Sequence, residues 1–84
     1  MGNLNLVFFQ KEDCDVTQVL RFFRNLGYSI EDYSHDFMEL GENSWLSQEG
    51  TYQQGVKWEL VDATEEEIEK IKEEIEKSNV LTFQ

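Results

Sequence analysis

The single histidine of the chain lies among carboxylates that suggest a metal site. His35 is followed by Asp36, and Glu31 and Glu39 lie four residues to either side of it. One imidazole with two carboxylates is a ligand set found in catalytic zinc sites. On a straight strand, four residues at about 3.3 Å each place each glutamate roughly 13 Å from the histidine, too far to share one ion. We therefore expect a solvated His35 and no metal.

Cys14 is the only cysteine, which excludes an intramolecular disulfide and a cysteine-based zinc site. Its position just before an expected helix would lower the pKa of the thiol and activate it. The neighbouring Glu12, Asp13 and Asp15 act in the opposite sense, because nearby negative charge disfavours a thiolate. We expect an unreactive thiol and a reducing, cytoplasmic location.

Other signatures of catalysis or cofactor binding are missing from the sequence. Gly41, Gly50 and Gly55 match no phosphate-binding loop, and their flanks are acidic. No G-x-S-x-G motif surrounds a serine. Carboxylates are so numerous that any one pair is weak evidence for acid–base chemistry. We expect a protein that is not an enzyme and has no cofactor.

The net charge of −11, from 18 acidic and 7 basic residues, restricts the class of partner. Direct binding to nucleic acid or to anionic membranes is disfavoured, because phosphate contacts need Lys and Arg. A protein with a basic surface is favoured instead. The N-terminus lacks the basic region and cleavage site of a signal peptide. No apolar run approaches the ~18–20 residues of a membrane span.

The segment 28–62 concentrates this charge, with eight acids against one base and six interleaved aromatic residues. Exposed aromatics are typical anchors of protein interfaces, and carboxylates steer a basic partner. The alternative is a solvated hairpin whose aromatics belong to the core, as we expect for Trp58 and Tyr28. The candidate partner-binding residues are Glu31, Asp32, Tyr33, Asp36, Glu39, Glu42, Trp45, Glu49 and Tyr52.

Two amphipathic helices with clear start signals separate the expected strands. Asp15 with Gln18, and Thr64 with Glu67, have the spacing of capping boxes. Gly27 is expected to end the first helix. Strands are expected over residues 3–10, 28–40 (bent or bulged), 44–48, 56–62 and 80–83, with turns at 41–43 and 50–55.

This order predicts one α+β domain over residues 1–84. Without the short 44–48 segment it reads βαββαβ, a ferredoxin-like arrangement: a four-stranded, possibly five-stranded, antiparallel sheet with two helices on one face. The other sheet face would be bare. Alternation puts Val7 and Phe9 on that face, where they would form a possible dimer surface.

Three functional hypotheses follow. The leading one is a non-catalytic inhibitor or adaptor, of the kind that phages and mobile elements encode, which competes with nucleic acid for a basic partner surface. The alternative is a homodimeric regulatory or small-ligand-binding domain that uses its open sheet face, so the choice between monomer and homodimer stays open. A third is RNA binding by base stacking on Phe9, Tyr33 and Trp45, which the negative charge disfavours.

Overall fold

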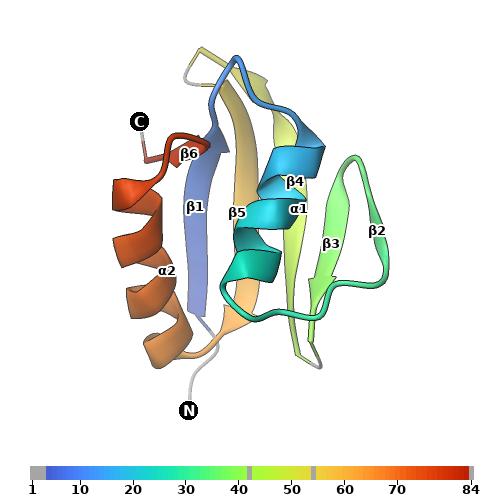
Figure 1. Cartoon of the computed structure of the whole chain (residues 1–84), viewed down its shortest axis with the longest axis vertical. Helices are drawn as coiled ribbons and strands as arrows, with labels where there is room; N and C mark the ends of the chain where they lie inside the picture. The colour runs from blue at the N-terminus through green and yellow to red at the C-terminus, as the bar shows by residue number, and fades with distance from the viewer. Residues whose placement is uncertain (1–3, 42, 54, 84) are drawn as a thin grey trace.

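The computed structural model describes residues 4–41, 43–53 and 55–83, which form one antiparallel sheet and two helices (Figure 1). The elements in chain order are β1 (Leu4–Gln10), α1 (Val16–Asn25), β2 (Tyr33–Ser34), β3 (Phe37–Leu40), β4 (Ser44–Tyr52), β5 (Gly55–Ala63), α2 (Glu65–Lys77) and β6 (Leu81–Thr82). The strand order is β2-β3-β4-β5-β1-β6. The predicted α+β class, with an antiparallel sheet and two helices on one of its faces, is confirmed.

The sheet has six strands in the described residues, so the expected four or five is wrong, and the ferredoxin-like assignment is not confirmed. The difference arises in residues 28–40, expected as one bent strand. The chain reverses at His35 and Asp36, and Ser34 pairs with Phe37 in a separate β2–β3 hairpin. This reversal explains why Met38 and Leu40 depart from the alternation that precedes them.

The strand expected over residues 44–48 is longer than predicted. β4 continues through Gly50 to Tyr52, and the register against β5 shifts between Gln48 and Gly50. Gly50 has φ +108°, in the region that favours glycine, so it forms a bulge within the strand. The expected loop over residues 50–55 is therefore wrong for most of its length.

Both helices begin and end as local chemistry dictates. The Asp15–Gln18 and Thr64–Glu67 capping boxes are formed in full. At the end of α1, the amide of Gly27 donates to the carbonyl of Arg24 and the amide of Tyr28 to that of Phe23, a Schellman motif. The glycine provides the required positive φ of +107°.

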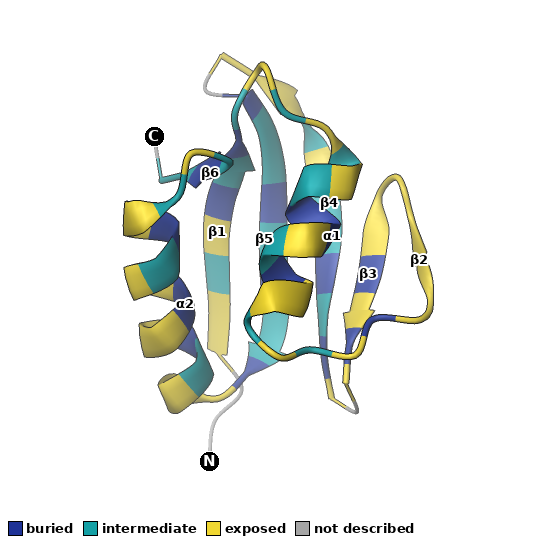
Figure 2. Cartoon of the chain, in the orientation of Figure 1, coloured by how far each residue is buried: buried dark blue, intermediate teal, exposed yellow. Residues whose placement is uncertain are grey.

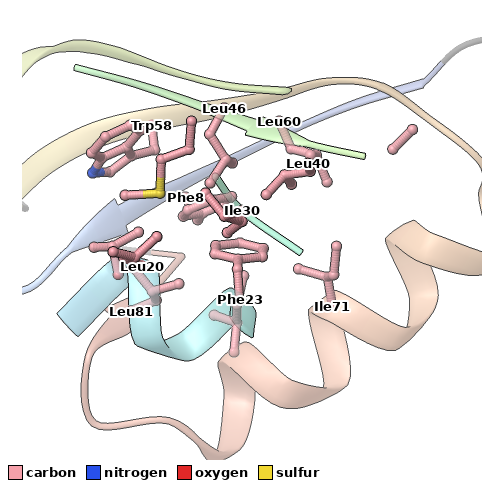
Figure 3. Close-up of a cluster of buried hydrophobic side chains, with 14 of the residues drawn as sticks. Phe8, Leu20, Phe23, Ile30, Leu40, Leu46, Trp58, Leu60, Ile71 and Leu81 are labelled. Carbon is pink, nitrogen blue, oxygen red and sulfur yellow. The ribbon is translucent and has the colours of Figure 1, made fainter. Parts of the chain in front are cut away.

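The core lies between the sheet and the two helices (Figures 2 and 3). Phe23 of α1 packs against Phe8 of β1, with ring centroids 5.9 Å apart, and Ile71 of α2 belongs to the same buried cluster. The indole Nε1 of Trp58 donates to Oε1 of the buried Gln10 at 3.0 Å. Residues 1–3, 42, 54 and 84 lie outside the described part of the chain.

Candidate functional site on the open face of the sheet

Both helices cover the same face of the sheet (Figure 1). The opposite face, called the open face below, carries a set of apolar side chains. Strand alternation and register place these side chains there because their neighbours along each strand point into the core. The six apolar residues of the open face are Val7, Phe9, Phe37, Trp45, Tyr52 and Val61. In the described residues, no helix or strand packs over them.

Three of the six are strongly exposed. The exposed fraction is 40% for Val7, 38% for Phe37 and 51% for Tyr52, and Phe9 and Trp45 are half-buried. The rings of Phe9 and Tyr52 lie edge to face with centroids 6.5 Å apart. This edge-to-face contact joins β1 to β4 across β5, so the apolar set spans the width of the central sheet.

Charged side chains lie between the apolar ones. Lys57 Nζ is 5.6 Å from the centre of the Tyr52 ring, a cation–π contact. Glu59 Oε2 accepts from the side-chain amide of Asn5 at 3.0 Å. Glu39 is paired in register with Trp45. The open face therefore has two carboxylates and one ammonium group among its strand residues.

The structure divides the predicted partner-binding residues. Glu39, Trp45 and Tyr52 all lie on the open face, with Glu39 paired to Trp45 and with Tyr52 at the other end of β4. Asp36 lies in the β2–β3 turn, where its carboxylate accepts from the Ser34 hydroxyl, and Glu49 lies at the bulge of β4; both are exposed at the margin of this face. Glu42 lies outside the described residues.

Tyr33, Glu31 and Asp32 lie elsewhere than expected. Tyr33 pairs with the core residue Met38, and Arg24 of α1 lies 5.8 Å from its ring centre. Its ring is therefore on the helix side of the sheet, not on the face proposed for base stacking. Glu31 and Asp32 are exposed and precede β2. Glu31 and Glu39 therefore do not share one strand with His35, contrary to the premise of the metal hypothesis.

Two groups of the open face escaped the sequence-based list. Phe37 was assigned to a single bent strand, and its face became evident only with the β2–β3 reversal. Lys57, Glu59 and Val61 of β5 also face away from the core and were not on that list. Their alternation with Trp58 and Leu60 was the signal that could have identified them.

The groups considered for catalysis are not brought together. His35 is exposed, and its Nε2 lies 3.9 Å from Oδ2 of the neighbouring Asp36. Burial, and second the nearby charge of Asp13, raise the pKa of the Cys14 thiol, so the reactive thiolate form is less populated. Within residues 4–41, 43–53 and 55–83, no three His, Cys, Asp or Glu side chains form a metal-binding group.

Comparisons with protein-family models, with curated proteins and with solved structures give no significant match to this chain. Neither helix in the described part of the chain is long and apolar enough to cross a membrane.

Proposed function

We propose that this protein is a cytoplasmic, non-catalytic binding module whose open face docks onto a protein with a basic surface. The observation that carries the proposal is the apolar set of the open face, which is exposed on a sheet whose other face packs against both helices to form the core. Exposing these side chains has a free-energy cost in water, which contact with a partner removes.

The apolar set has the composition of an interface centre. Trp45, Tyr52, Phe37 and Phe9 are aromatic, and aromatic residues dominate the binding energy of protein interfaces. They project from three strands of one sheet, so little side-chain or backbone order has to be gained on binding. A rigid aromatic patch of this kind supports specific docking.

The charge of the chain selects the partner. Glu39 and Glu59 lie within the open face, and exposed Asp36 and Glu49 lie at its margin. Lys57, the one ammonium group that the described strand residues place on this face, lies over the Tyr52 ring. A partner with Lys and Arg around an apolar patch complements this pattern and is attracted over long range by the net charge of −11.

Competition with nucleic acid is the sharper form of this proposal. If the basic surface of the partner is one that binds DNA or RNA, carboxylates of the module occupy the positions of phosphates and the module acts as an inhibitor. Glu39 and Glu59 on the open face, with Asp36 and Glu49 at its margin, are the described carboxylates proposed for this role, while Glu31 and Asp32 lie away from that face. A labelled oligonucleotide bound to the purified partner would then be displaced by the module.

Two tyrosines on opposite sides of the sheet give a matched test. Tyr52 on the open face is 51% exposed and lies against Lys57, while Tyr33 on the helix side is 50% exposed and lies against Arg24. A partner is first recovered by affinity purification from the native host and then purified. Its affinity for the wild type, Tyr52→Ser and Tyr33→Ser is measured by isothermal titration calorimetry.

We expect Tyr52→Ser to weaken binding by roughly tenfold or more, the effect of removing an interface anchor. Tyr33→Ser should leave the affinity within about threefold of the wild type. Glu39→Lys should weaken binding most at low salt, while Glu12→Lys, in the β1–α1 connection, should not. Equal effects of the two tyrosine changes, or a partner without a basic surface, would refute the proposal.

A homodimer is the second candidate, and the exposure of Val7 beside Phe9 is the observation that favours it. Two chains of net charge −11 repel each other, which opposes it. Sedimentation of the wild type separates the two candidates. A tight dimer that Phe9→Glu converts to a monomer would establish self-association and replace the proposal above.

For the fold, we infer that β2 and β3 extend a ferredoxin-like unit made of the other elements. The order β4-β5-β1-β6 within the sheet supports this inference. That architecture hosts many unrelated functions and does not itself indicate one.

A further inference from the structure

One edge of β1 is covered along only part of its length. The short strand β6 pairs with β1 at Phe9 and Gln10, and Figure 1 shows β6 beside the upper end of β1 alone. The opposite edge of β1 is paired with β5 from Leu4 to Gln10. In the described residues, the outer edge from Leu4 to Phe8 therefore has no strand beside it.

The main chain of this uncovered stretch has hydrogen-bonding groups directed outward. The amide of Lys11 donates to the carbonyl of Val80 on the β6 side of β1. Main-chain groups two residues apart along a strand point the same way, so those of Phe9, Val7 and Asn5 also face outward. On this outer side Phe9 pairs with Thr82, while Val7 and Asn5 pair with no residue of β6.

This edge lacks charged side chains and proline, two of the features that protect strand edges from pairing. Residues 4–8 read LNLVF, with no charged residue and no proline. Leu4 and Val7 are about two-fifths exposed, and Figure 2 shows the lower end of β1 in the colour of exposed residues. The stretch spans about 13 Å at 3.3 Å per residue, enough to pair with a short extended segment.

The charged side chains of α2 indicate which kind of segment would bind at the β1 edge. Glu67 and Lys70 lie on the side of α2 that faces α1, because they bond to Tyr28 and Leu26. Helical spacing places the exposed side chains that overhang the β1 edge on the opposite side. These are Glu65, Glu69, Lys72 and Glu76, three acids and one base.

A second copy of the chain fits this edge poorly. Antiparallel pairing of two β1 edges would place two α2 helices side by side on the same sheet face. Each α2 has seven glutamates and three lysines, so the helices would repel. A segment with Lys or Arg is attracted by the same helix.

We propose that the outer edge of β1 from Leu4 to Val7 binds an extended, Lys- or Arg-containing segment of the partner protein as an added β-strand. The segment bonds to the main chain of Asn5 and Val7, and its cationic side chains face the carboxylates of α2. This inference rests on the proposed function and adds the form in which the basic partner is recognised. Val7 joins the two surfaces, since its side chain lies on the open face and its main chain on the edge.

The probe is the peptide most enriched when a random-peptide display library is selected on the immobilised wild-type chain. Its affinity is compared for Val7→Pro, which removes the outward amide, and Val7→Thr, which keeps it. Proline is tolerated where the amide of an edge strand faces solvent, so Val7→Pro is expected to fold. Amide hydrogen exchange of the wild type with and without peptide gives a second readout that needs no variant.

We expect the selected peptide to be cationic. Its affinity should fall by roughly tenfold or more for Val7→Pro and by less than about threefold for Val7→Thr. Exchange at Asn5 and Val7 should slow when the peptide binds. Failure to enrich a cationic peptide, or unchanged exchange at both amides, would overturn the inference. If Tyr52→Ser weakens partner binding but Val7→Pro does not, the inference about the β1 edge is wrong and the proposed function stands. If Val7→Pro weakens partner binding but Tyr52→Ser does not, binding at the edge is supported and docking through the open face is wrong.

Discussion

At the scale of the residue, Gly55 shows how closely β5 approaches the end of β1. A Cβ placed on Gly55 would overlap the carbonyl oxygen of Gln10, and φ is +127°. Gly41 also has a positive φ, of +90°, but a Cβ there meets no atom within 4 Å. Substituting Gly41 therefore tests the free-energy cost of a side chain at positive φ alone, while substituting Gly55 adds the cost of steric overlap with Gln10.

We expect Gly41→Ala to destabilise the protein by about 1–2 kcal/mol, the cost of a side chain at positive φ. Gly55→Ala adds the displacement of a strand and should destabilise by about 3 kcal/mol or more. Urea unfolding followed by circular dichroism measures both. Equal losses for the two variants would contradict the close approach.

Local chemistry made several single residues predictable. Asp15, Thr64 and Gly27 have one dominant role each, since capping and positive φ depend on the nearest few residues. Tyr33 was misplaced because its face depends on where the chain reverses, and no glycine or proline marks the turn at His35 and Asp36. Ser34 and Asp36 are turn-forming residues, but without a glycine they signal a two-residue hairpin only weakly.

At the scale of the element, one hydrogen bond ties the end of α1 to the start of α2. The Tyr28 hydroxyl donates to Glu67 Oε2 at 2.7 Å. Burial raises the pKa of the Tyr28 phenol well above its usual value, and the bond to Glu67 adds to the shift. The folded state therefore retains this proton to higher pH than the unfolded chain does.

Stability should consequently fall above about pH 10, where the unfolded tyrosine begins to lose its proton. The loss is at most about 1.4 kcal/mol per pH unit, and solvent screening of this half-exposed group reduces it. Tyr28→Phe should remove this part of the pH dependence, while Tyr52→Phe should retain it. Urea unfolding at several pH values provides the measurement, and parallel curves for the wild type and Tyr28→Phe would contradict the assignment.

The elements differed in how well periodicity identified them. The stripes of α1 and α2 and the alternation of β1 and β5 were predicted and confirmed, because one face of each is buried in the core. Residues 28–40 and 50–55 were assigned wrongly. There β2 and the end of β4 lie toward the rim of the molecule, where few buried positions reveal the pattern.

At the scale of the whole molecule, the sheet separates two roles. One face, with both helices, supplies the core; the open face and the outer edge of β1 remain accessible among the described residues. The sequence indicated a bare face through Val7 and Phe9, yet the strands that complete it come from distant segments, and register between them is not a local property. The acid-rich segment predicted as one site is instead divided between the two faces and the rim.

The measurement that tests the open face most directly is a map of partner contacts on the ¹⁵N-labelled chain by amide NMR titration. With the purified basic partner, we expect signals of the open-face residues Val7, Phe9, Trp45, Tyr52 and Val61 to shift or broaden. The exposed residues of α1 and α2 that face away from the sheet should be unaffected. Changes confined to the hollow between the helices, lined by Phe22, Leu26 and Lys77, would contradict docking through the open face.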